Sequence, residues 1–153
     1  TLRITKRAGM RLVFVGIGVV MFVSSIVLGN RLTKDGPIDW VYYTPVILED
    51  ALAKGDTVVL EFTAEWCLNC KFLESTVLHS SRVVEAFESD NVSPIKIDLT
   101  GNNVAGNALL DGVGGLRIPL LIILGPDGEE VFRGDFYTVD QVLDAIATSQ
   151  GVD

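Results

Sequence analysis

The apolar and polar positions divide the chain into one long apolar run and a longer region of short, alternating elements. Residues 12–28 form a run of 17 residues without a charged side chain. At about 1.5 Å per helical residue this run is roughly 25 Å long, which is near the lower limit for crossing a bilayer. The pattern therefore predicts that residues 1–34 consist of a basic N-terminus and a transmembrane helix.

Basic residues flank this run unevenly, with the larger cluster before it. Four precede the run and two follow it: Arg3, Lys6, Arg7, Arg11, Arg31 and Lys34. Because the more positive flank stays in the cytoplasm, we expect a single inner-membrane span with the rest of the chain in the periplasm. A cleaved signal peptide, with a weak cleavage site at residues 27–29, is the alternative and delivers the rest of the chain to the same side. The chain begins with Thr1, so we also expect a piece of a longer protein.

After a linker over residues 35–43, helical and strand patterns alternate through one expected domain, residues 44–153. Thr44 and Pro45 are typical of a helix start, and Gly55 is typical of its end. The pattern predicts strands over residues 57–63, 92–99, 120–124 and 130–136, and further helices over 67–88 (with a break at 79–81), over 102–111 and from 138 onward.

The order of these elements indicates an α/β fold. A helix connects the first two strands, so they must run parallel, whereas the last two are joined by a tight turn and form a hairpin. We therefore expect a mixed central sheet with helices on both faces.

Composition and charge exclude several classes of function. The 153 residues include 48% hydrophobic residues and carry a formal net charge of −8, which disfavours nucleic acid as a partner. Residues 1–34 hold six of the twelve bases and none of the twenty acids, so the predicted domain is strongly acidic. Two cysteines and one histidine are too few for a structural zinc site or a disulfide-rich scaffold.

The candidate chemistry is a pair of cysteines at the junction of a predicted strand and helix. Cys67 would lie at the helix start, where the helix dipole favours the thiolate, and Cys70 would lie one turn further on. In that geometry the exposed Cys67 attacks a disulfide of a partner protein, and the more buried Cys70 resolves the mixed disulfide.

Other interpretations of the pair stay open. The two thiols are compatible with half of a metal site or with structural cysteines of the core, and His79 is expected to be a surface residue at a helix end rather than a ligand. A non-catalytic module that binds Cu(I) or docks a partner is a further alternative.

Residues 62–71, FTAEWCLNCK, resemble the active site of the thioredoxin superfamily. More narrowly, they are similar to the C-terminal periplasmic domain of the DsbD family of transmembrane thiol:disulfide interchange proteins. The resemblance covers about residues 40–148. It implies a thioredoxin-like fold, a preceding transmembrane helix, and a cis-proline at Pro119.

The resemblance also implies roles for other residues. Glu61 matches a buried acid that exchanges a proton as Cys70 reacts, and its apolar neighbours favour burial. Glu74, one turn after Cys70, matches an acid that opposes formation of the Cys67 thiolate. Trp66, Ile118 and Pro119 match positions that contact the partner.

Five positions depart from the family pattern. Leu68 and Asn69 between the cysteines match neither reducing nor oxidising relatives, so they leave the reduction potential open. Arg117 stands where glycine is common and brings a positive charge to the partner groove. Leu120 stands where threonine is usual, and Glu61 where aspartate is commoner.

We therefore expect a membrane-tethered thiol:disulfide oxidoreductase that reduces disulfides of periplasmic proteins and requires no cofactor beyond the Cys67–Cys70 pair. The resemblance implies that a membrane electron-transfer domain supplies the electrons, with a place in electron transport and cytochrome c biogenesis. A disulfide oxidase or isomerase of the same fold is the alternative. The membrane contact would be made by residues 12–28.

Overall fold

The computed structural model describes residues 14–25 and 36–151, which belong to two compact units, Thr1–Asp35 and Gly36–Asp153. In the first unit, residues 14–25 are helical, and the Ser25 hydroxyl donates to the Met21 carbonyl at 2.8 Å. Among the described residues, no helix combines the length and apolar character that a membrane span needs. The ends of the predicted span, residues 12–13 and 26–28, lie outside the described residues, so the span stays a prediction.

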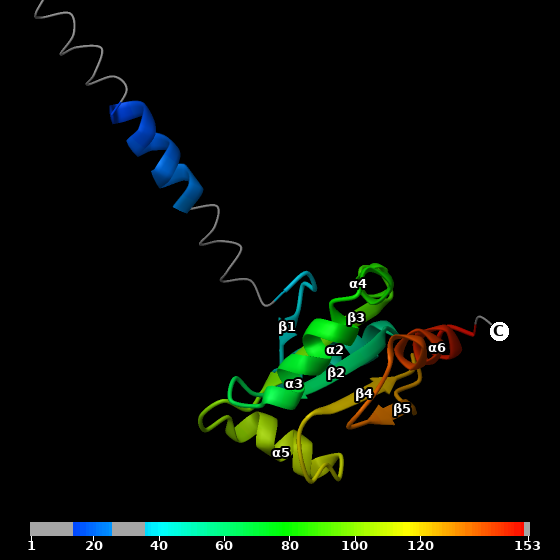
Figure 1. The fold of residues 1–153 in the computed structure, drawn as a ribbon. Helices are drawn as coiled ribbons and strands as arrows, with labels where there is room; N and C mark the ends of the chain where they lie inside the picture. The colour runs from blue at the N-terminus through cyan, green and yellow to red at the C-terminus, as the bar shows by residue number, and fades with distance from the viewer. Residues whose placement is uncertain (1–13, 26–35, 152–153) are drawn as a thin grey trace, which may run out of the picture. The chain divides into compact units, whose positions relative to one another are not determined.

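The second unit is built on a five-stranded sheet with the order β1-β3-β2-β4-β5 (Figure 1). Its strands are β1 (Val41–Tyr42), β2 (Thr57–Thr63), β3 (Val92–Asp98), β4 (Leu120–Leu124) and β5 (Glu130–Gly134). The first three run parallel to one another, and β4 is antiparallel to both β2 and β5. The predicted mixed sheet and its C-terminal hairpin are therefore confirmed.

Helical segments connect and cover these strands. They are α2 (Pro45–Lys54), α3 (Leu68–Leu73), the π-helix η1 (Glu74–Leu78), α4 (Ser81–Phe87), α5 (Val104–Gly112) and α6 (Val139–Ser149). The predicted start and end of α2 are confirmed, since the Thr44 hydroxyl accepts from the Ile47 amide at 3.2 Å and Gly55 closes the helix at φ 76°. The predicted break at residues 79–81 separates η1 from α4.

The core has two halves, one on each face of the sheet. Alternate residues of β2 enter different halves: Val59 faces η1, α4 and α6, whereas Val58 and Leu60 face α2 and α5. This alternation is the period of two that a strand imposes on its side chains. It confirms that helices lie on both faces, and it sends Glu61 to the same side as Val59.

The structure differs from the sequence-based expectation at the segment before α2. Residues 35–43 were predicted to be a linker, yet Val41 and Tyr42 pair with Ile95 and Lys96 of β3 as a short edge strand. Ile38, with 6% of its surface exposed, is part of the core. A two-residue strand is too short to produce a recognisable alternation, and the Gly36–Pro37 pair dominates the local pattern.

Candidate active site

The two cysteines form a disulfide at the start of α3, directly after β2. Their sulfurs are 2.10 Å apart, and Cys67 Sγ also accepts a hydrogen bond from the Cys70 amide at 3.2 Å. Cys67 is therefore the N-cap of the helix, as its place at the strand-to-helix junction predicts. Both residues are buried, but Cys67 exposes 7% of its surface and Cys70 only 2%. Cys67 is thus less exposed than predicted, while remaining the more accessible of the two.

Apolar side chains stand out from the surface near this helix start. Trp66, Leu68 and Phe72 expose 67%, 83% and 57% of their surfaces. Trp66 is therefore a surface residue and not part of the core. These side chains give the surface around the disulfide an apolar character, which suits contact with another protein.

A hollow of about 350 Å³ lies between α3 and the loops before β4 and after β5. Phe72 lines it from the helix, Ile118 and Pro119 line it from the loop before β4, and Phe136 lines it from the loop after β5. The Ile118–Pro119 peptide bond is cis, as the resemblance implied. Arg117 also lines the hollow, which places this departure from the family pattern beside the candidate site.

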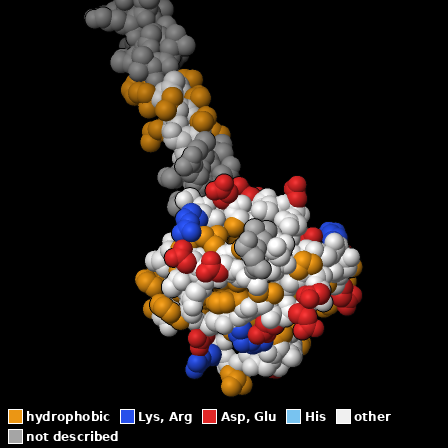
Figure 2. All heavy atoms as spheres, turned by 90° about the vertical axis from the view of Figure 1, so that its right-hand side faces the viewer, with side chains coloured by type: hydrophobic (Ala, Val, Ile, Leu, Met, Phe, Trp, Pro, Cys, Tyr) orange, Lys and Arg blue, Asp and Glu red, His pale blue; other side chains and the backbone are white. Residues whose placement is uncertain are grey.

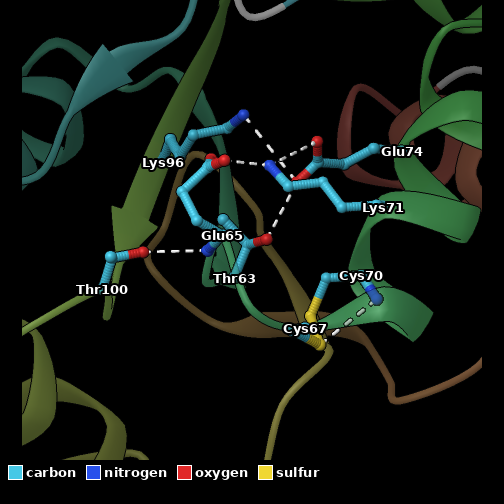
Figure 3. Close-up of a disulfide and its surroundings, with 8 residues drawn as sticks. All are labelled: Thr63, Glu65, Cys67, Cys70, Lys71, Glu74, Lys96 and Thr100. Carbon is cyan, nitrogen blue, oxygen red and sulfur yellow. Dashed lines mark hydrogen bonds and ion pairs between the residues drawn. A yellow bond between two sulfur atoms is a disulfide. The ribbon is translucent and has the colours of Figure 1, made fainter.

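Behind the disulfide, a cluster of buried charged residues links α3 and η1 to the sheet (Figure 3). Lys96 Nζ lies 3.7 Å from Glu61 Oε2 and 3.9 Å from Glu74 Oε1, so one ammonium group faces two carboxylates. Glu61, Glu74 and Lys96 expose only 2%, 6% and 3% of their surfaces. Water screens such a buried cluster weakly, so each charge in it acts strongly on the others.

Glu74 is held by partners on three sides. The Thr63 hydroxyl donates to Glu74 Oε1 at 2.8 Å, and Lys71 Nζ lies 3.5 Å from Glu74 Oε2. Figure 3 shows the Glu74 carboxylate pointing toward Lys96 and Thr63 rather than toward the disulfide. Any influence of Glu74 on the thiols is therefore that of its charge acting through space, and not that of a hydrogen bond to a sulfur.

Glu61 is the most perturbed acid of the cluster. Burial, with a smaller contribution from the neighbouring Glu74 carboxylate, raises the pKa of Glu61 to about 8, although Lys96 acts in the opposite direction. A carboxyl group with a pKa near neutrality is able to take up and release a proton under physiological conditions. Its burial was predicted from the apolar run around it, and the structure confirms that burial.

Trp40 and Tyr137 lie beside the buried charged cluster, and Lys71 extends it to the surface. The Lys96 ammonium lies 5.2 Å from the centre of the Trp40 ring, within the range of a cation–π interaction. Tyr137 is buried, and burial together with Glu61 and Glu74 raises the pKa of its hydroxyl. At the surface, Lys71 Nζ also pairs with Glu65 Oε1 at 2.8 Å.

The sequence did not predict Lys96, Thr63, Trp40 or Tyr137 as members of the site. The only sequence signal for Lys96 is a charged residue inside an apolar strand pattern, Ile95-Lys96-Ile97. That Lys96 lies beside Glu61 becomes evident only from the register of β2 and β3, which pairs the two residues.

His79 does not lie fully at the surface, and among the described residues it belongs to no group that would hold a metal ion. His79 was expected at the surface, but it is half-buried and lies so close to Gly36 that a Cβ there would approach the imidazole to 2.3 Å. Over residues 14–25 and 36–151, no three His, Cys, Asp or Glu side chains are grouped so that they would hold a metal ion.

Comparison with known proteins points to one family. A family model described as Thioredoxin-like matches residues 39–126. The thiol:disulfide interchange protein DsbD of Pseudomonas fluorescens is 36% identical over 83 residues, which cover 54% of this chain and 14% of that protein. DsbD of Salmonella choleraesuis is 30% identical over 144 residues, covering 82% of this chain and 23% of that protein. The chain thus spans less than a quarter of the length of these relatives.

Solved structures share the fold. The C-terminal domain of Neisseria meningitidis DsbD in its reduced form has a TM-score of 0.56 and 24% identity, and covers 71% of this chain and 99% of that one. A structure described as DsbH oxidoreductase has a TM-score of 0.60 and 17% identity, covering 76% of this chain and 86% of that one. These similarities confirm the thioredoxin-like fold expected from residues 62–71.

Proposed function

Since the chain belongs to the thioredoxin-like family, we propose that it is a membrane-tethered thiol:disulfide oxidoreductase that reduces disulfides of periplasmic proteins. One observation carries the proposal: the Cys67–Cys70 disulfide lies at the start of a helix, bordered by exposed apolar side chains and by the hollow at Pro119. The pair that reacts and the surface that receives a partner are therefore parts of one site.

The exchange begins with the reduced pair. The Cys67 thiolate attacks one sulfur of the partner's disulfide, a mixed disulfide forms, and the partner's other sulfur leaves as a thiolate. Cys70, deprotonated, then attacks Cys67 Sγ, so the Cys67–Cys70 bond forms and the partner's second sulfur leaves. Two electrons pass to the partner, and the protein ends in the oxidised state that the structure shows.

Glu61 has the properties of the proton carrier for the second attack. A buried carboxyl group with a pKa of about 8 is partly ionised near neutral pH and is able to accept the proton that Cys70 loses. Glu74 and Lys96 act on this step as positioning residues, because their charges set the field around Glu61.

The tether and the electron source come from the sequence and from the relatives. The apolar run of residues 12–28, with its larger basic cluster on the N-terminal side, supports a span that leaves the domain in the periplasm. The relatives' name, thiol:disulfide interchange protein, supports an exchange partner that reduces Cys67–Cys70 again after each cycle, and we propose that this donor is a membrane electron-transfer domain. Periplasmic proteins with disulfides are the corresponding acceptors.

The test uses the full chain in detergent, reduced with dithiothreitol and freed of excess reductant, then mixed with a disulfide-bearing model protein. The wild-type chain should release two thiols of the acceptor per molecule while it forms its own disulfide. Cys67→Ser should abolish this release, whereas Cys70→Ser should accumulate a mixed disulfide that gel electrophoresis detects without reductant. Thiol release by Cys67→Ser at the wild-type rate would overturn the proposal.

A further inference from the structure

The hollow beside the disulfide continues into a second one of different character. The first is apolar, with Phe72, Pro119 and Phe136 among its lining residues. The second is lined by Leu116, Leu120, three glycines and Arg133. Arg117 and Asp135 line both hollows and form the border between them. We call these the apolar compartment and the basic compartment.

The border is an ion pair that contributes little to folding. Arg117 Nε and Nη2 donate to the same oxygen, Asp135 Oδ2, at 3.1 and 2.6 Å. The two side chains are 77% and 49% exposed, so water screens their attraction and the pair adds little stability. A guanidinium group has five N–H donors, and the bonds to Asp135 engage two of them. Arg117 therefore retains donors for a second carboxylate.

The basic compartment is unusual for this domain. Residues 35–153 contain six basic residues against twenty acidic ones, and two of those six, Arg117 and Arg133, line this one hollow. Acidic side chains are common over the face of the domain that Figure 2 shows. Arg133 is also paired, with both Glu130 oxygens at 2.9 and 2.5 Å. Asp135 and Glu130 balance the two guanidinium groups, so the compartment is close to neutral within a strongly acidic domain, and its arginines keep N–H donors that these pairs do not engage.

We propose that the partner's disulfide lies in an extended segment that places an apolar side chain against Phe72 and Phe136 and an aspartate or glutamate side chain beside Arg117 and Arg133. The inference rests on the proposed function, because that function brings a disulfide-bearing segment to the same site. The occupant is an acidic partner segment, since Arg117 retains N–H donors here that Asp135 does not engage, while the acidic remainder of the domain would repel acidic chains placed elsewhere. Arg117 is then a specificity-determining residue.

Peptides with one activated cysteine test this directly. Each peptide carries its cysteine in a disulfide with thionitrobenzoate and an adjacent leucine, and has Glu, Gln or Lys at one of the second to fourth positions on either side. Attack of Cys67 on the peptide sulfur releases the coloured thionitrobenzoate, so stopped-flow absorbance gives the rate constant. At low salt and at one position at least, the reduced full chain should react about threefold to fivefold faster with Glu than with Lys.

The variants separate the charge of Arg117 from other causes. Arg117→Gln should remove the preference for Glu, and Arg117→Glu should reverse it. Arg82→Gln is the matched control, because Arg82 is an exposed arginine that pairs with Asp140 at 2.9 Å between α4 and α6. This control should keep the wild-type preference. Salt at about 0.5 M should weaken the preference in the wild-type chain, because it screens exposed charges.

Two failures are distinguishable. If every peptide reacts at the same rate, or if Arg117→Gln keeps the wild-type preference, this inference is overturned while the proposed oxidoreductase function stands. If no peptide and no model protein disulfide reacts with the reduced chain, the proposed function itself has failed.

Discussion

Lys96 and Glu61 face each other across paired strands, with Nζ 3.7 Å from Oε2 and both side chains almost completely buried. Glu74 lies 3.9 Å from the same ammonium group, so one cation serves two acids in the interior. Removing a partner from a buried charge cluster leaves uncompensated charge, which costs far more than the loss of a surface pair. This relationship connects η1 to the central sheet. Changes in the cluster should therefore alter the free energy of unfolding and its dependence on pH.

Lys96→Met should destabilise the fold and change its response to pH. Without the ammonium group, two carboxyl groups face each other without their cation, so the pKa of Glu61 should rise further. We expect the free energy of unfolding at pH 7 to fall by about 3 kcal/mol. The loss should be larger at pH 9, where Glu61 ionises in the wild-type protein, than at pH 7, where Glu61 is mostly protonated. Urea denaturation at both pH values measures this.

Lys54→Met, at an exposed lysine in the last turn of α2, is the control and should change the free energy of unfolding by less than about 0.5 kcal/mol. An equal loss for Lys96→Met at pH 7 and pH 9 would show that its effect is one of packing alone.

Glu61 should make the fold less stable as the pH rises from about 5 to 8. In this window the folded state holds a proton on Glu61, whose pKa is about 8, while the unfolded chain, with a carboxyl pKa near 4.5, has lost it. Stability therefore falls by up to ~1.4 kcal/mol for each pH unit across this window and levels off above pH 8. Glu61→Gln should flatten this slope, as followed by urea denaturation at pH 5, 6, 7 and 8.

Glu49→Gln, at an exposed position of α2, should retain the wild-type slope. The same slope in Glu61→Gln and in the wild-type chain would mean that another group titrates in this window.

Part of this site was predictable from sequence, and the reasons are visible at particular residues. The burial of Glu61 follows from the apolar residues on both sides of it within a strand pattern. Lys96 was not identified as its partner, because 34 residues separate Glu61 from Lys96 along the chain and periodicity does not fix the register between two parallel strands. Local patterns thus located the elements, and the pairing of the elements located the cluster.

The helix after the cysteines shows the same limit. Its apolar period predicted one helix over 67–88 with a break at 79–81, and the break is confirmed. The change to a π-helix at Glu74 was not predicted, because it depends on tertiary contacts, among them the hydrogen bond between Thr63 and Glu74. Such single π turns have no residue preference strong enough to appear in a sequence pattern.

Thr63→Val should cost about 2 kcal/mol of stability, because it removes a buried hydrogen bond to a charged group while keeping the shape of the side chain. Thermal or urea denaturation at pH 7 measures the loss. Thr76→Val is the matched control: Thr76 is exposed, and its hydroxyl donates to the Phe72 carbonyl at 2.7 Å. If both variants lose the same stability, the Thr63 bond to Glu74 has no special weight.

Phe136→Ala should weaken the reaction with protein disulfides but not with a small disulfide. Phe136 is 71% exposed and lines the apolar compartment, so its ring is available to a partner and is not packed in the core. We expect kcat/KM for a protein acceptor to fall about fivefold to tenfold, mainly through KM, with oxidised glutathione reduced at the wild-type rate. Val46→Ala, at an exposed apolar position of α2, should change neither rate. Equal losses for both acceptors would assign Phe136 to the thiol chemistry or to the fold.

Cys67 and Cys70 are proposed to form a reducing dithiol, and the reduction potential of the pair tests this most directly. The full chain in detergent is equilibrated with dithiothreitol or glutathione buffers, quenched with an alkylating agent, and weighed by mass spectrometry to give the oxidised fraction. We predict a potential of about −270 to −200 mV, in the range of thioredoxin and glutaredoxins. A value near about −120 mV would make the pair an oxidant, and failure to form the intramolecular disulfide in any buffer would contradict the mechanism as a whole.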